Sequence, residues 1–157
     1  MLLLATLLCA AGCRTPHPIP PADFSDPAWK LHHGQAVWRP NSEAQEVAGD
    51  LLVATRSDGQ FVVQFTKIPV PLVVARRSPR AWEIQFPSDG REASGRLPPP
   101  ERLIWLHLPD ALRDEALPPG WTFERLDDGL WRLSAVERGE FIEGYLDPDM
   151  MPNLPTP

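Results

Sequence analysis

The stretch Gly59-Gln60-Phe61-Val62-Val63-Gln64-Phe65-Thr66 decides the fold class of this chain. Phe61, Val63 and Phe65 project to one side of an extended backbone, and the more polar residues between them project to the other. This period of two is typical of a β-strand with one buried and one exposed face. The strand is preceded by Ser57-Asp58-Gly59, where glycine supplies the positive φ that a tight hairpin needs. We therefore expect an antiparallel sheet around this segment.

The same alternation continues on both sides of the stretch. Trp82, Ile84 and Phe86 alternate with polar residues, and further turn signals occur at 88–90, 127–129 and 137–139. Short strands joined by tight turns predict a mainly β domain, built as a curved antiparallel sheet or an unclosed β-barrel. The expected strands cover residues 33–39, 46–55, 60–66, 71–77, 81–87, 91–96, 121–126, 130–135 and 140–146.

One segment departs from the β pattern. Three prolines at 98–100 lead into Glu101-Arg102-Leu103-Ile104-Trp105-Leu106-His107-Leu108, which is followed by another proline. Proline suits the first turn of a helix, and an acidic residue suits its N-terminus. We expect a short helical plug here, lying against the sheet because its apolar side chains cannot all face water. Residues 110–116 are expected to add another helical turn.

The N-terminus resembles the signal peptide and lipobox of a bacterial lipoprotein. An apolar run over residues 2–12 ends at Cys13, and it is much shorter than the ~20 residues that span a bilayer. The resemblance implies cleavage before Cys13, acylation of its thiol and a membrane partner held through the lipid. Arg14, in place of aspartate, implies the outer membrane, with the domain facing the periplasm. The alternative is a buried N-terminal element of a cytoplasmic protein.

These features divide the chain into four parts. Residues 1–12 are the expected signal peptide, and residues 13–27 are the acylated cysteine with a proline-rich, extended tether. Residues 28–146 form the expected β-rich domain, and residues 147–157 are a tail that we expect to be poorly ordered.

Composition narrows the function classes. The formal net charge of −6 argues against a nucleic-acid partner, and with only two cysteines, Cys9 and Cys13, the mature domain has no disulfide of its own. The chain carries no zinc-ligand, nucleophile-serine or phosphate-loop motif. We therefore expect a protein that is not an enzyme and has neither a cofactor nor a metal site. A monomer is expected as well, although these features do not determine it.

The remaining polar candidates have ordinary structural interpretations. His32 and His33 are strand neighbours that point to opposite faces, and an enzyme would have to combine one of them with a carboxylate such as Glu83 or Glu143. His107 is expected at the rim of the core. The arginines at 76, 77 and 80 are expected at a solvated hairpin end, although they suit an acidic partner or a phosphate.

Two long stretches resemble the LolB family of outer-membrane lipoprotein receptors, relatives of the periplasmic carrier LolA. They are Arg96–Pro109 with the following Gly120-Trp121-Thr122-Phe123, and the earlier Gly59–Phe65 with Pro71-Leu72-Val73-Val74. The resemblance covers about residues 45–146 and implies an unclosed barrel, plugged by helices, around a cavity for acyl chains. It also implies a projecting apolar loop, for which the segment 67–71 offers Ile68 or Val70.

Six tryptophans are a heavy aromatic load, which fits either a filled core or an acyl-chain cavity. The leading hypothesis is a lipoprotein that binds acyl chains or lipoproteins and acts in outer-membrane lipid or lipoprotein localisation. The alternative is a scaffold lipoprotein of the envelope that docks a protein partner without lipid cargo. The residues expected to line the cavity are Phe61, Phe65, Trp82, Ile84, Phe86, Leu103, Trp105, Leu106 and Trp121.

Overall fold

A computed structural model describes residues 18–147 of the chain. The expected signal peptide, the expected acylation site Cys13 and residues 148–157 of the expected tail lie outside the described residues. Within residues 18–147, no helix is both long enough and apolar enough to span a bilayer.

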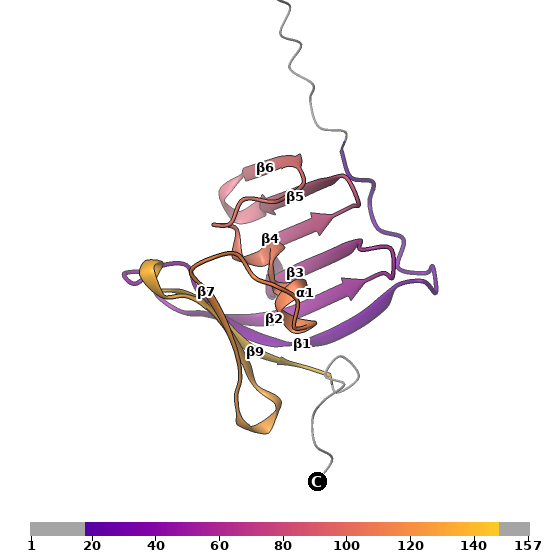
Figure 1. The fold of residues 1–157 in the computed structure, drawn as a ribbon. Coiled ribbons are helices and arrows are strands. Elements are labelled where there is room, and N and C mark those ends of the chain that lie inside the picture. The colour runs from indigo at the N-terminus through magenta and orange to yellow at the C-terminus, as the bar shows by residue number, and fades with distance from the viewer. Residues whose placement is uncertain (1–17, 148–157) are drawn as a thin grey trace, which may run out of the picture.

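Within residues 18–147, nine strands form a single sheet, as the alternation predicted. The sheet order is β6-β5-β4-β3-β2-β1-β9-β8-β7, and all neighbouring strands are antiparallel. The outermost strands β6 and β7 do not pair with each other, so the sheet is unclosed. Figure 1 shows that the sheet is also curved. The strands are β1 (Lys30–Arg39), β2 (Val47–Thr55), β3 (Phe61–Lys67), β4 (Val70–Arg77), β5 (Ala81–Phe86), β6 (Arg91–Arg96), β7 (Trp121–Arg125), β8 (Trp131–Ala135) and β9 (Glu140–Leu146).

Strand β1 joins the two ends of the domain. It pairs with β2 on one side and with β9 on the other, so that the arm formed by β9, β8 and β7 continues the sheet. In Figure 1 this arm turns away from the stacked strands β2–β6, and the connection from β6 to β7 crosses in front of the sheet. The sheet therefore has a concave side that faces this connection.

A row without bulky side chains allows the sheet to bend at this junction. Ala36 in β1 lies opposite Gly49 in β2 and Gly144 in β9. A Cβ atom on Gly49 would lie 2.5 Å from the carbonyl oxygen of Thr66, and one on Gly144 would run into the carbonyl oxygen of Gln35. Glycine permits such a close approach of neighbouring strands. The sharp curvature is thus encoded at these positions.

The plug, residues 103–112, is less helical than the sequence predicts. Instead of a helix over residues 101–108 there is a 3-10 turn, η2 (Ile104–Leu106), followed by the five-residue helix α1 (Leu108–Leu112). Pro109 was expected to end the helix but lies in the first turn of α1, where its missing amide hydrogen costs no hydrogen bond.

The expected helical turn over residues 110–116 is also shorter. It ends with α1 at Leu112, and Asp114 has a φ of 57°, in the left-handed region. A residue in this conformation cannot continue a right-handed helix. The backbone therefore leaves the plug there and continues toward β7.

The described end of the proline-rich segment packs on the domain. Trp29 is buried against Ala54 and Val62 on the convex side of the sheet. The Arg56 guanidinium lies 5.5 Å from the Trp29 ring and forms a 2.7 Å ion pair with Asp26. Residues 18–29 therefore follow the convex face, away from the plug.

Candidate functional site

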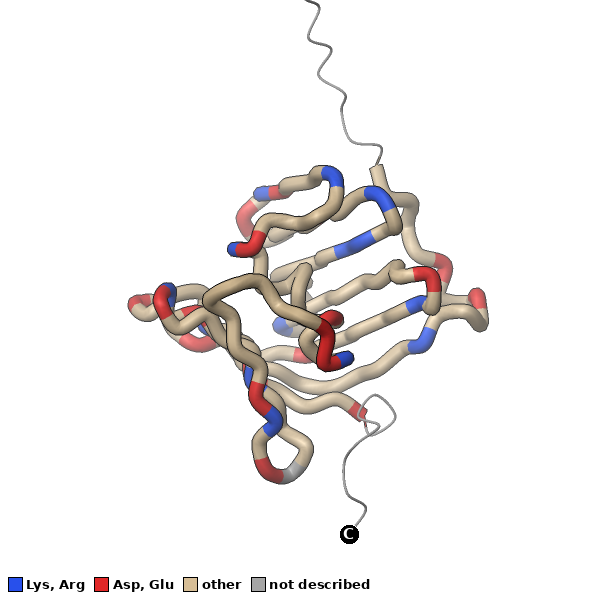
Figure 2. Tube along the Cα trace, in the orientation of Figure 1, with Lys and Arg blue, Asp and Glu red and all other residues tan. Residues whose placement is uncertain are grey.

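The inward side chains of the sheet form one apolar face. Register places Phe61, Val63 and Phe65 of β3 on the same side as Val53 in β2 and Ile84 in β5. Each of these five side chains is at most 1% exposed. Figure 2 shows the complement of this pattern, because charged residues gather mostly at strand ends and in loops. The candidate site is this concave face together with the plug that covers it.

An aromatic group at the centre of the concave face joins the plug to the sheet. The Trp105 ring stacks on Phe65 with centroids 5.1 Å apart, and its edge meets Trp38 at 5.4 Å. Trp38 in turn stacks on Phe86 at 6.4 Å. The cavity prediction omitted Trp38, although the alternation in β1 that buries Ala36 also turns Trp38 inward.

All nine residues predicted to line a cavity belong to one apolar cluster. Seven are buried within it, while Phe86 and Leu103 are partly buried against it. Trp82 and Trp121 lie at its margins, 8% exposed, where their indole N–H groups donate to the carbonyl oxygens of Arg96 at 2.9 Å and Glu101 at 2.7 Å. The structure thus brings the predicted set together.

These side chains fill the concave face in this conformation. Ile84, Leu106 and Trp105 are at most 1% exposed, and they pack against one another and the sheet. A hollow of about 410 Å³ lies instead over β1, β2 and β9, lined in part by Val37, Ala48 and Tyr145, which register places on the convex side. An acyl chain therefore enters the concave face only if the plug moves.

A paired ionic contact fastens the plug to the sheet. The Nη1 and Nη2 atoms of Arg77 in β4 donate to Oδ2 and Oδ1 of Asp110 in α1, at 2.7 and 2.8 Å. Both side chains are about 15% exposed, and the Arg77 guanidinium lies 4.5 Å from the Phe61 ring. Arg113 also donates to Asp110 Oδ1, at 2.8 Å. Asp110 thus neutralises Arg77 where water is largely excluded.

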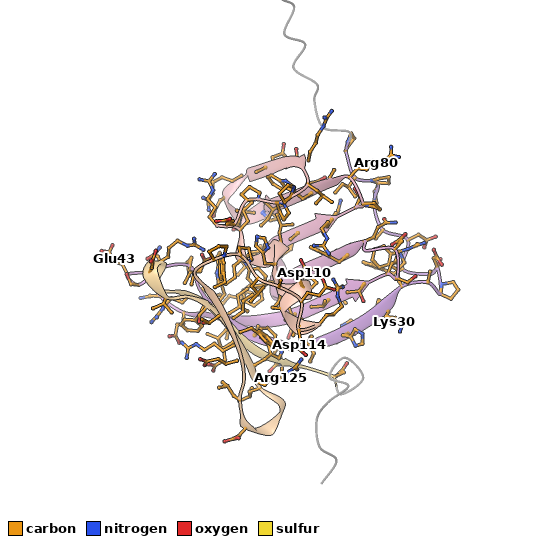
Figure 3. All side chains as sticks on the ribbon, in the orientation of Figure 1. Lys30, Glu43, Arg80, Asp110, Asp114 and Arg125 are labelled. Carbon is orange, nitrogen blue, oxygen red and sulfur yellow. The ribbon has the colours of Figure 1, made fainter. Side chains whose placement is uncertain are left out.

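The far end of the plug is attached to the arm of the sheet. Arg125 in β7 donates to the carbonyl oxygen of Leu112 at 3.2 Å and to the carboxylate of Asp114 at 2.9 Å. Figure 3 shows Asp110, Asp114 and Arg125 gathered around α1 in front of the sheet. Within the connection, His107 Nε2 lies 3.1 Å from the carbonyl oxygen of Pro100. The plug is therefore held by apolar packing at its centre and by polar contacts around its edge.

Glu140 is a buried carboxyl group near the aromatic centre. It lies at the start of β9 and is 9% exposed. Burial raises the pKa of Glu140, and the neighbouring Arg138, 3.5 Å away, and the Trp38 indole partly offset this increase. This residue is a source of pH dependence next to the candidate site.

The histidine and glutamate candidates for catalysis are not brought together. His32 is 7% exposed on the concave side, whereas His33, Glu83 and Glu143 lie on the convex side. Glu83 pairs with Arg76 at 3.9 Å, and Glu143 with Arg132 at 3.4 Å. Within residues 18–147, no group of three or more His, Cys, Asp and Glu residues is placed to hold a metal ion.

The expected arginine cluster is divided between the two faces. Arg76 pairs with Glu83 on the convex side, but Arg77 turns inward to Asp110 because successive strand residues alternate. The prediction that the three arginines lie at a solvated hairpin end is therefore wrong for Arg77, whose side chain is only 15% exposed. The period of two predicts its inward direction, but nothing local in the sequence identifies Asp110 as its partner.

The loop expected to project does carry exposed apolar side chains. Ile68 and Val70 are 76% and 45% exposed at the turn between β3 and β4.

No protein-family model matches the chain, and no curated protein is significantly similar to it.

Proposed function

We propose that this protein is a non-enzymatic, lipid-anchored envelope protein that holds an acyl chain of a lipid or lipoprotein between the concave face and a displaced plug. One observation carries the proposal: the apolar face of an unclosed sheet is covered by a short plug, residues 103–112, instead of by further strands. A cover that contains only one 3-10 turn and a five-residue helix has few backbone hydrogen bonds of its own.

The apolar burial of an acyl chain can offset the displacement of the plug. Each CH₂ group buried from water contributes about 0.8 kcal/mol, so a chain of about ten carbons recovers roughly the apolar burial that a few plug side chains give up. The ligand has to bind the open form better than the closed form in order to shift the population. The closed structure is then the ligand-free state.

The attachments of the plug fit a movable cover. The Arg77–Asp110 pair and the Arg125 bonds lie at its edge, where both partners regain water when they separate. The centre of the contact is aromatic, so displacement of Trp105 leaves the apolar surface of Phe65 free for a hydrocarbon chain. Residues 18–29 follow the convex face and do not obstruct this opening.

The proposed membrane attachment rests on Cys13, which lies outside the described residues. The exposed Ile68 side chain would add a second apolar contact, either with a membrane surface or with an acylated cargo protein. On this proposal the chain is a lipoprotein that handles other acylated molecules, at the outer membrane and facing the periplasm.

Binding of a dansyl-labelled undecanoic acid tests this proposal. The full chain carrying Cys13→Ser is titrated with the probe, and its fluorescence is expected to rise and saturate. Trp105→Arg places a charge on the side of the plug that faces the bound chain and should weaken binding at least about tenfold. Val136→Arg, at an exposed position outside the site (74% exposed), is the matched control and should leave binding unchanged. If the full chain carrying only Cys13→Ser shows no saturable binding of the probe, the proposal is overturned.

A scaffold lipoprotein is the second candidate, and the filled concave face favours it. If the plug never opens, it serves only as part of the core, and the protein acts through its surface. Hydrogen exchange separates the two candidates. The scaffold predicts exchange at residues 104–112 as slow as in β3, whereas a movable plug exchanges faster than β3 and is slowed by the fatty-acid probe.

A further inference from the structure

Three tryptophans in the centre of the fold, Trp38, Trp105 and Trp131, have a buried indole N–H group without a hydrogen-bond partner within residues 18–147. Two of them, Trp105 and Trp131, are 1% and 0% exposed, and both belong to the apolar cluster of the concave face. Buried polar groups are nearly always hydrogen-bonded in folded proteins, so each of these donors requires an explanation.

The tryptophans at the margins of the same cluster behave differently. Trp82 donates to a carbonyl oxygen in β6, and Trp121 donates to one in the connection that follows β6. The third buried indole N–H group, that of Trp38, also lacks a well-formed hydrogen bond, but it lies beside the Glu140 carboxyl group and acts to lower the pKa of that group. The fold therefore satisfies the indoles of Trp82 and Trp121 at the margins of the concave face and places the Trp38 indole beside a carboxyl group. It leaves Trp105 and Trp131 without an acceptor.

We propose that these two indoles donate hydrogen bonds to the carbonyl oxygens of the bound ligand, so that the site selects acyl esters and amides over plain hydrocarbons. This inference rests on the proposed function and specifies its ligand class. Trp105 lies on the plug and Trp131 on β8, opposite Gly144, so the two donors come from the two surfaces that would enclose the chain. A diacyl or triacyl ligand carries several carbonyl groups and can engage both.

A neutral carbonyl suits these donors better than a carboxylate. Arg77, an inward cation near the site, is already neutralised by Asp110, and burial of a second, unpaired carboxylate would be costly. An ester or amide oxygen accepts a hydrogen bond without bringing a charge into the concave face. The acyl linkages of lipids and lipoproteins have this chemistry.

Competition between an ester and a matched hydrocarbon tests the inference. The fluorescent fatty acid is displaced from the full chain carrying Cys13→Ser by methyl laurate or by pentadecane, which have the same number of heavy atoms. Trp105→Phe and Trp131→Phe remove the donor and keep an aromatic ring. Trp29→Phe, in the separate cluster on the convex face, is the matched control.

We expect the ratio of ester to hydrocarbon affinity to fall about three- to tenfold in Trp105→Phe or Trp131→Phe, which corresponds to the loss of one hydrogen bond, and to stay unchanged in Trp29→Phe. If both ligands bind and no variant changes the ratio, the inference is overturned and the proposed function stands. If neither ligand binds, the proposed function itself fails.

Infrared spectroscopy provides a second measurement that does not depend on the variants folding. When isotope-labelled methyl laurate is bound to the full chain carrying Cys13→Ser, with both tryptophans in place, its carbonyl stretch is expected at a lower frequency than in alkane solvent. A bound ester whose carbonyl absorbs as it does in alkane solvent overturns the inference, because its oxygen then accepts no hydrogen bond.

Discussion

Arg77 in β4 and Asp110 in α1 are joined by two parallel hydrogen bonds of 2.7 and 2.8 Å, and this ion pair connects the sheet to the plug. The planar guanidinium matches the carboxylate, a geometry that makes charge-assisted bonds strong. Because both side chains are mostly buried, either charge left alone would be poorly solvated. On the proposed function, the pair therefore determines how readily the concave face opens.

Asp110→Asn should loosen the plug. The substitution leaves the Arg77 charge without its counter-ion, and we expect the free energy of unfolding to fall by about 1–3 kcal/mol, measured by urea denaturation. Hydrogen exchange at residues 104–112 should become faster. Arg113→Gln removes only the more exposed partner of Asp110 and should cost less than about 1 kcal/mol. Equal exchange in the two variants would contradict this role of the Arg77–Asp110 pair.

Gly144→Ala should be strongly destabilising. Its Cβ atom would run into the carbonyl oxygen of Gln35 in the neighbouring strand, so backbone has to move. We expect a loss of about 3 kcal/mol, measured by thermal or urea unfolding. Gly120→Ala is the matched control: its φ is 82° and a Cβ there meets nothing within 4 Å, so only the conformational cost of about 1–2 kcal/mol applies. A smaller loss for Gly144→Ala than for the control would refute the close strand approach.

Glu140 should make the domain less stable as the pH rises. Its pKa is raised by burial in the folded state, so the folded protein binds this proton more tightly than the unfolded chain does. Its stabilising contribution is complete below the ordinary pKa of 4.5 and is lost as the pH rises through the raised pKa. In Glu140→Gln this loss should disappear. The difference in unfolding free energy between the two proteins, followed from below pH 4.5 upward, measures the effect; a difference that does not vary with pH rules it out.

Cys13→Ser should abolish lipid attachment. In a bacterial host fed an alkyne-bearing palmitate, the natural chain is expected to become labelled and to fractionate with membranes, whereas the Cys13→Ser chain should do neither. Cys9→Ser is the matched control, because the resemblance to a lipobox places Cys9 in the removed segment. Labelling that is lost in Cys9→Ser but kept in Cys13→Ser would overturn the assignment of the anchor.

The strands could be predicted because their signals are local. Alternation such as Phe61, Val63 and Phe65 shows which residues face the core, and Asp-Gly turns mark where one strand gives way to the next. All nine expected strands are present, with ends displaced by at most three residues. The plug was predicted less well, because Pro109 is compatible both with the end of one helix and with the beginning of another, and only α1 shows which applies.

The sequence by itself determined the class of the fold, its nine-strand order along the chain and the apolar composition of its interior, because periodicity and turn chemistry act over a few residues. Only the tertiary structure decided how that interior is used. The stacking of Trp105 on Phe65, the pairing of Arg77 with Asp110 and the unpartnered indole of Trp131 each depend on segments far apart in the chain. Register, curvature and side-chain volume act together at such contacts, and no local pattern encodes them.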